Sequence, residues 1–249
     1  MKKSIITLFV TVIIITGLAV SNFAVIYKSG DRLRVLSSSL AFRDNPSFKG
    51  KLNWVIPYGH KIKVVRKTGK VLTIEGIRGQ WVEVIHQGQK GFVFDGYLSQ
   101  LPAPPFKCES YRQYGEKKLG KIGRVKTTVV RGHMDDKDPS KNKYPYEGKN
   151  LQKFGRNAWI ESHFIYDPQG IEVTITRFYL DKVSLEEGFL IARHCGSQGM
   201  TGAKGLINPF KDMPFKKNIR GEVILTGNDE EITIKKQKSG VLIKFRRSL

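Results

Sequence analysis

Apolar and charged residues alternate at a period of two in the first half of the chain. Ile62 and Val64 alternate with lysines, and Trp81 follows the polar Gln80. This period places successive side chains on opposite faces of a strand, so it predicts strands that are buried on one face only. Glycines separate these runs where the backbone must turn, at positions 69, 76, 79 and 88. Several such strands predict a small closed barrel.

The second half predicts a sheet. Residues 171–175 alternate Ile or Val with Glu or Thr, and the turn at 167–170 would pair them with the aromatic run 159–166. Three more strands are predicted, over residues 222–226, 232–236 and 241–245, of which the last two form a hairpin that turns at 238–240. Residues 132–155 and 196–217 are expected to be long basic loops.

One helix is predicted in this half. Ser184 and Glu187 have the spacing of a capping box, in which each side chain satisfies a free amide at a helix start. The helix would run to about Cys195 and end at Gly196, because glycine favours the left-handed cap. The predicted fold class is therefore mainly β: a small barrel followed by an α+β domain with an antiparallel sheet and one helix.

An ordered set of motifs lies between Leu40 and Leu98. They are Leu40, Arg43 and Pro46-Ser47, then Tyr58-Gly59 before an alternating strand, then Trp81, Val84, Gly88, Gly91-Phe92-Val93 and Tyr97-Leu98. In this order they resemble a bacterial SH3-like domain, over about residues 32–101. Residues 108–249 resemble no family. The aromatic residue after Gly91 is Phe where Trp is commoner, and the stretch 67–79 is longer than a tight turn needs, so it would enlarge a loop on one rim.

The resemblance implies a binding module rather than a catalyst. We expect Tyr58, Trp81, Phe92 and Tyr97 to contact the ligand. The two tyrosines are the better candidates, because an aromatic ring with a polar tip suits a half-exposed groove. The alternative for Trp81 is a core position. The alternative for Tyr58 and Tyr97 is packing at the barrel edge.

The N-terminus predicts export. Lys2 and Lys3 precede an uncharged, mostly apolar run from Ser4 to Tyr27. Residues 1–27 are therefore either a cleaved signal peptide or an N-terminal membrane anchor, since about 20 apolar residues span a bilayer. Either way the body would lie in the periplasm or at the cell surface. The remaining domain boundaries are 28–101 for the SH3-like barrel, 102–107 for a Pro-rich linker that acts as a hinge, and 108–249 for the basic α+β domain.

The chain has two cysteines, Cys108 and Cys195. An even number in an exported protein favours a disulfide bond, here one that joins the start of the second domain to its middle. The alternative is two unpaired buried thiols.

Positive charge is present in both halves. Residues 31–98 carry 12 basic and 5 acidic side chains, a net +7, and residues 106–249 carry 28 and 17, a net +11. Such a field attracts polyanions. Nucleic acid is disfavoured by predicted export and by the lack of a recognisable nucleic-acid-binding motif. Peptidoglycan, another anionic envelope polymer or an envelope protein is the expected partner. Acidic glycans and the phosphates of a membrane surface would suit the same charge, and the N-terminal segment offers a further membrane contact. The alternative is that the charge serves solubility.

Catalytic chemistry has weak support. His194 and Cys195 are adjacent at the end of the predicted helix, where the dipole disfavours a thiolate and neighbouring side chains point about 100° apart. A zinc site at His133, Asp135 and Asp136 would need further ligands at regular spacing. His163 is the one other candidate, and no ligand at regular spacing supports it. We expect no metal and no cofactor.

The sequence thus predicts an exported, non-enzymatic binding protein of the cell envelope, whose SH3-like module recognises peptidoglycan or another anionic wall component. Two alternatives stay open: a cell-wall hydrolase or cysteine peptidase with a catalytic C-terminal domain, and a protein-protein adaptor.

Overall fold

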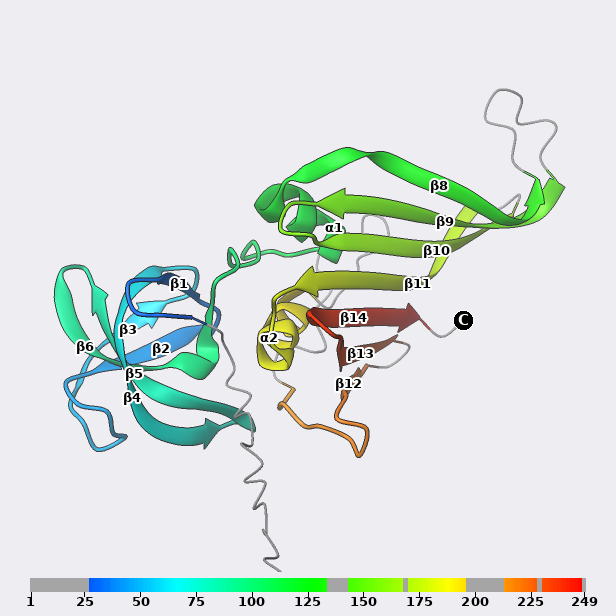
Figure 1. Ribbon diagram of the computed structural model, residues 1–249. Coiled ribbons are helices and arrows are strands. Elements are labelled where there is room, and N and C mark those ends of the chain that lie inside the picture. The colour runs from blue at the N-terminus through cyan, green and yellow to red at the C-terminus, as the bar shows by residue number, and fades with distance from the viewer. Residues whose placement is uncertain (1–26, 134–142, 168–169, 196–212, 228–229, 248–249) are drawn as a thin grey trace, which may run out of the picture.

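The computed structural model describes residues 27–133, 143–167, 170–195, 213–227 and 230–247 of the 249-residue chain. Two antiparallel sheets make up most of it, which confirms the mainly β prediction (Figure 1). The proposed export segment, residues 1–26, lies outside the described residues, and only Tyr27 of that prediction is inside them. Within the described part of the chain, no helix has the length and apolar character needed to cross a membrane.

The first sheet is a half-barrel of seven strands in the order β3-β2-β6-β5-β4-β1-β7. The strands are β1 (Arg32–Val35), β2 (Ser39–Arg43), β3 (Leu52–Pro57), β4 (Lys61–Ile74), β5 (Ile77–His86), β6 (Gln89–Phe94) and β7 (Leu98–Ser99). A 3-10 turn, η1 (Asp95–Tyr97), precedes β7. As predicted, β4 buries alternate side chains: Ile62 and Val64 are almost fully covered and alternate with exposed lysines. For β5 the predicted alternation is wrong, because Gln80, Trp81 and Val82 are all buried, and Val82 and Val84 rather than Trp81 belong to the core.

The expected loop at residues 67–79 is wrong. These residues continue β4 and begin β5, and they form a long two-stranded hairpin. Glu75 and Gly76 both have positive φ, 51° and 81°, which is the backbone geometry of a two-residue hairpin turn. An irregularity in the pairing between Lys67 and Val71 accommodates the extra residues. The hairpin therefore extends from the half-barrel as an ordered arm.

Tyr27, the first residue that the structure describes, is hydrogen-bonded to the first sheet. Its hydroxyl donates to Asp95 Oδ2 at 2.6 Å, and the backbone N–H of Gln80 donates to Asp95 Oδ1 at 2.7 Å. Burial raises the pKa of the Asp95 carboxyl above its usual range, although both hydrogen bonds oppose that shift. The segment that follows the N-terminal apolar run is thus fixed in the sheet by a buried hydrogen-bonded pair.

The second sheet has seven strands in the order β12-β13-β14-β11-β10-β9-β8. The strands are β8 (Lys121–His133), β9 (Lys143–Phe154), β10 (Trp159–Asp167), β11 (Gly170–Asp181), β12 (Val223–Thr226), β13 (Glu230–Lys236) and β14 (Gly240–Arg247). The predicted pairing of β10 with β11 and the β13–β14 hairpin are confirmed. The expected loop at 132–155 is wrong in part, because Lys143–Phe154 is a strand. Most of the expected loop at 196–217 lies outside the described residues.

Helices cover one face of the second sheet. The predicted helix, α2, spans Leu185–Cys195, and its capping box is present: Ser184 Oγ accepts from the Glu187 N–H at 3.1 Å, and Glu187 Oε2 accepts from the Ser184 N–H at 3.2 Å. Gly196 lies outside the described residues. A second helix, α1 (Tyr111–Tyr114), continues into η2 (Gly115–Leu119) and was not predicted. Tyr111 and Tyr114 pack on Phe178 of β11. In Figure 1, α2 lies between the two sheets.

Candidate functional site

Trp81 and Phe92 lie on the outer face of the first sheet, opposite the core residues Val82 and Val84. Trp81 is only 5% exposed because the ring of Phe48 lies edge-on to it, with centroids 5.6 Å apart and planes at 75°. Phe48 itself is 60% exposed, and it belongs to the loop between β2 and β3. Phe92 is half-buried. The accessible aromatic surface here is therefore Phe48, supported from beneath by Trp81.

Charged groups surround this aromatic surface. Lys49 and Lys51, next to Phe48 in the loop, are exposed. The face that carries Phe92 also carries the ion pair between Arg66 Nε and Glu83 Oε2, at 2.6 Å. Arg43 at the loop entrance donates from Nη1 to the carbonyl of Gly50 at 2.6 Å, which holds the loop against β2. The loop thus presents one apolar ring, followed along the chain by two exposed lysines, on an ordered base.

Tyr58 and Tyr97 lie at a different place, on the contact between the two sheets. Tyr58 follows β3, and its ring stacks on the imidazole of His194 in α2, 4.6 Å between centroids. Tyr97 in η1 is 9% exposed and lies edge-on to Phe94. Burial raises the pKa of both phenols well above the usual value. The four predicted ligand residues therefore form two separate pairs rather than one groove, and ligand contact by any of them stays a prediction.

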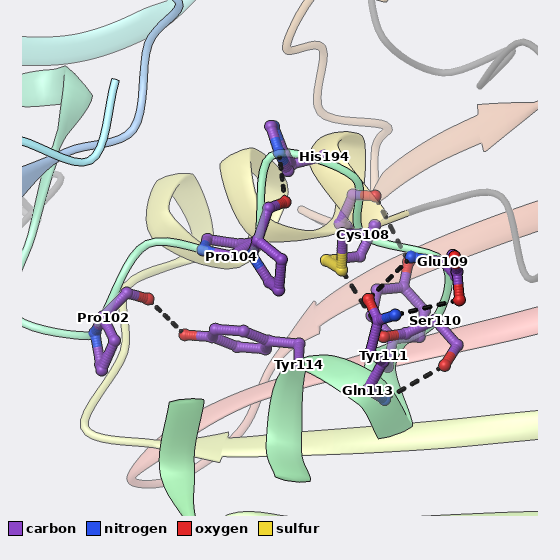
Figure 2. The surroundings of a disulfide bond; sticks show 12 residues. Pro102, Pro104, Cys108, Glu109, Ser110, Tyr111, Gln113, Tyr114 and His194 are labelled. Atoms are coloured by element: carbon purple, nitrogen blue, oxygen red, sulfur yellow. Dashed lines mark hydrogen bonds between the residues drawn. A yellow bond between two sulfur atoms is a disulfide. The ribbon is translucent and has the colours of Figure 1, made fainter. Parts of the chain in front are cut away.

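The proline-rich linker is held by Tyr58, which follows β3, and by helices α1 and α2. The carbonyl of Pro102 accepts a hydrogen bond from the Tyr114 hydroxyl at 2.9 Å (Figure 2), and the carbonyl of Pro104 accepts one from the Tyr58 hydroxyl at 2.9 Å. His194 Nε2 lies 3.0 Å from the carbonyl oxygen of Pro105. Proline carbonyls remain free to accept because proline removes only the N–H donor. The expected hinge at 102–107 is, in this structure, a hydrogen-bonded segment.

The disulfide bond between Cys108 and Cys195 is present, with Cα atoms 4.9 Å apart (Figure 2). It joins the end of the linker to the last residue of α2. Because its sulfur is bonded to Cys108, Cys195 supplies no thiolate while the disulfide is intact. His194 beside it contacts Tyr58 and the linker. The structure thus assigns this residue pair a place in the contact between the sheets.

The β4–β5 arm completes that contact. At its tip, Gly76 approaches the backbone carbonyl of Phe215, and Glu75 Oε2 lies 3.9 Å from Arg193 Nη1. At the other side, the carboxyl of Glu187 is buried among Ser99, Gln100 and Ser184, and burial raises its pKa to about 7. A carboxyl group at a helix N-terminus normally favours its charged form, so desolvation outweighs the helix dipole and the hydrogen bonds at this position.

Sequence reasoning missed a histidine pair on the first sheet. Trp54 Nε1 donates to His86 Nδ1 at 3.3 Å, so the proton of neutral His86 is on Nε2, 3.4 Å from His60 Nδ1. Burial, with a smaller effect of His60, lowers the pKa of His86. The three side chains come from separate elements, and neither their spacing nor their type signals this arrangement. The arrangement favours the neutral form of His86.

No group of three or more metal-ligating side chains occurs among the residues that the structure describes. His133 ends β8, whereas Asp135 and Asp136 lie outside the described residues. His163 faces Glu147, 3.9 Å away.

No protein-family model, curated protein or solved structure matches this chain.

Proposed function

We propose that this protein is an exported, non-enzymatic binding protein of the cell envelope, in which the first sheet is an SH3-like module that recognises peptidoglycan or another anionic wall component. The observation that carries the proposal is the exposed Phe48 ring, which lies edge-on to buried Trp81 in a loop that also carries the exposed Lys49 and Lys51. An accessible aromatic ring with a rigid support gives a ligand apolar contact at little entropic cost.

The charge and the disulfide support the same proposal. Both halves of the chain are basic, so the field around the protein attracts anionic polymers. The Cys108–Cys195 bond is compatible with an oxidising compartment, in which envelope proteins are found. The apolar run after Lys2 and Lys3 fits export, by cleavage or by anchoring.

The peptidase alternative has less support. It would need the Cys195 thiolate, and that sulfur is part of the disulfide. The adaptor alternative would use the Tyr58 and Tyr97 region, where both side chains already contact the rest of the chain.

Retention on purified cell wall tests the proposal. The oxidised protein should sediment with the wall more strongly than an unrelated protein of equal net charge. Equal retention of the two proteins would refute specific wall recognition, and turnover of wall peptides by the parent protein would favour the enzyme.

A further inference from the structure

The second sheet has one uncovered face. Helices α1 and α2 pack on the side of the sheet that carries Phe154, Phe178, Val241 and Ile234. Side chains on the opposite face, from Leu151 in β9 to Lys235 in β13, are half-buried or exposed. No element of the described ranges packs on them. We call this side the open face.

Two aromatic rings lie on inner strands of the open face, near one end of those strands. Trp159 in β10 pairs with Tyr179 in β11, and their rings stack with centroids 5.7 Å apart and planes 19° from parallel. The Tyr179 hydroxyl is 3.2 Å from Asp181 Oδ1 and 2.7 Å from Ser239 Oγ, which fixes the ring. Both residues are half-buried, so each retains accessible surface. The pair is a preformed apolar platform near one end of the inner strands, on an otherwise largely polar face.

Lysines lie at both ends of this row. The strand register aligns Lys153, Trp159, Tyr179, Leu242 and Lys235 across five adjacent strands. Adjacent strands are about 4.8 Å apart, so the two lysines are separated by roughly 19 Å along the row. This spacing suits an extended chain that crosses the strands, with its centre on the rings and its charges at the lysines.

Positive charge exceeds negative charge on the whole open face. The strand register places these basic residues on it: Lys126, Arg131, Lys149, Lys153, Arg177, Lys235, Lys244 and Arg246. The acids on it or ion-paired with its cations are Glu147, Glu161, Asp181, Glu222 and Glu231. Glu161 is paired with Arg177 at 2.9 Å, Glu147 lies 3.8 Å from Arg131, and Glu222 lies 3.2 Å from the exposed Lys235. A surface pair of this kind contributes little, so an anionic ligand can replace Glu222 at Lys235. The remaining cations complement a polyanion.

We propose that the open face binds an anionic glycan chain, with sugar rings against Trp159 and Tyr179 and with carboxylate or phosphate groups at the flanking lysines. Sugar rings have apolar C–H faces that pack on aromatic rings, whereas a flexible acidic peptide offers charge without such faces. This inference rests on the proposed envelope function, and it assigns the second sheet a polymer contact apart from the Phe48 surface.

Binding of the full, oxidised chain to soluble polymers tests it. The probes are polygalacturonate, polyglutamate of equal charge, and single-stranded oligo(dT), all at one salt concentration. We expect polygalacturonate to bind tightest. Trp159→Ala should weaken it about tenfold or more, as loss of a central aromatic contact does, and Trp159→Tyr should restore most of the loss.

Matched charge variants separate the open face from general charge. Lys153→Gln/Lys235→Gln/Lys244→Gln removes three cations from the open face, and Lys61→Gln/Lys63→Gln/Lys70→Gln removes three from the first sheet. The first variant should weaken polygalacturonate binding clearly more than the second. Circular dichroism and an intact disulfide should verify the fold of each.

Several outcomes would overturn the inference: equal effects of the two triple variants, no effect of Trp159→Ala, polyglutamate bound as tightly as polygalacturonate, or tighter binding of oligo(dT). The last would indicate a nucleic-acid surface. If open-face variants bind like the parent while wall retention persists, only this inference fails. If the parent lacks specific wall retention, the proposed function fails.

Discussion

The ring of Tyr58 lies 8° from parallel to the imidazole of His194, and its hydroxyl donates to the carbonyl of Pro104. One side chain of the first sheet thus contacts both α2 and the linker. Such a residue couples the two sheets, because its contacts exist only when both are folded and docked.

We expect Tyr58→Ala to destabilise the protein by about 2 kcal/mol, through loss of one stacked pair and one hydrogen bond. Tyr58→Phe retains the stack and should lose about 1 kcal/mol or less. Urea unfolding of parent and variants measures both. An alanine variant as stable as the parent would show that this contact does not couple the sheets.

The tip of the β4–β5 arm offers a matched pair of glycines. Gly76 and Gly88 both follow a residue of positive φ in a hairpin turn, with φ of 81° and 79°. A Cβ at Gly88 would meet nothing within 4 Å, whereas a Cβ at Gly76 would overlap the carbonyl of Phe215. Gly88→Ala should therefore show only the backbone penalty of about 1 kcal/mol.

Gly76→Ala should add steric overlap to that penalty and destabilise by a further ~1–3 kcal/mol. Thermal or urea unfolding of the two variants gives the comparison. Equal losses would mean that the arm does not press on Phe215 in solution.

Local signals along the chain predicted much of the fold. Three such signals were confirmed. The capping box at Ser184 and Glu187 begins a helix, the alternating residues of β11 form a strand paired with β10, and the two cysteines form a disulfide bond. Strand β8 gave no such signal, because its side chains are exposed on both faces and lack alternation. The arm was missed because Glu75-Gly76 is a less typical turn pair than Asn-Gly.

The candidate site was less predictable. Tyr58 and Tyr97 are residue types that suit a half-exposed groove, but helix α2, distant in sequence, packs against both. Phe48 was not singled out, because a lone Phe in a polar loop has no pattern around it. The Trp159–Tyr179 pair depends on the register of two strands, which a prediction of the strands alone does not determine.

The disulfide should contribute strongly to stability. It closes a loop of 87 residues, for which the chain-entropy model gives about 4 kcal/mol. The Cys108→Ser/Cys195→Ser variant should lose stability of that order in urea. Alkylation of the denatured parent without reductant should add no alkyl group by intact mass, and addition of two groups would contradict the bond.

Glu187 should make stability depend on pH. Its pKa is raised to about 7 in the folded protein from an ordinary value near 4.5, so the folded state holds the proton more tightly than the unfolded state. Its stabilising contribution is full below pH 4.5 and is lost as the pH rises to about 7. His86 has the opposite effect on stability, because its pKa is lowered in the folded protein. The stability that neutral His86 contributes is lost as the pH falls below about 6.5.

Glu187→Gln isolates the first effect, because glutamine can still accept from the Ser184 N–H but does not titrate. The stability of this variant relative to the parent should increase from pH 4.5 to pH 8. Exposed Glu116→Gln is the control and should show a flat difference. A flat difference for Glu187→Gln as well would mean that the carboxyl is ionised normally.

Wall binding should separate the contribution of charge from that of the Phe48 surface. Phe48→Ala leaves the net charge unchanged, and we expect it to reduce wall retention by about tenfold if this ring supplies ligand choice. Phe106→Ala is the matched control, because Phe106 is 83% exposed but lies in the linker.

Exposed charges are screened over about 8 Å at physiological ionic strength, so retention of the parent should also fall steeply with added salt. The loss from Phe48→Ala should persist at high salt, since an apolar contact is not screened. If Phe48→Ala and Phe106→Ala behave alike while salt abolishes retention, charge alone drives capture and the Phe48 surface has no part in it.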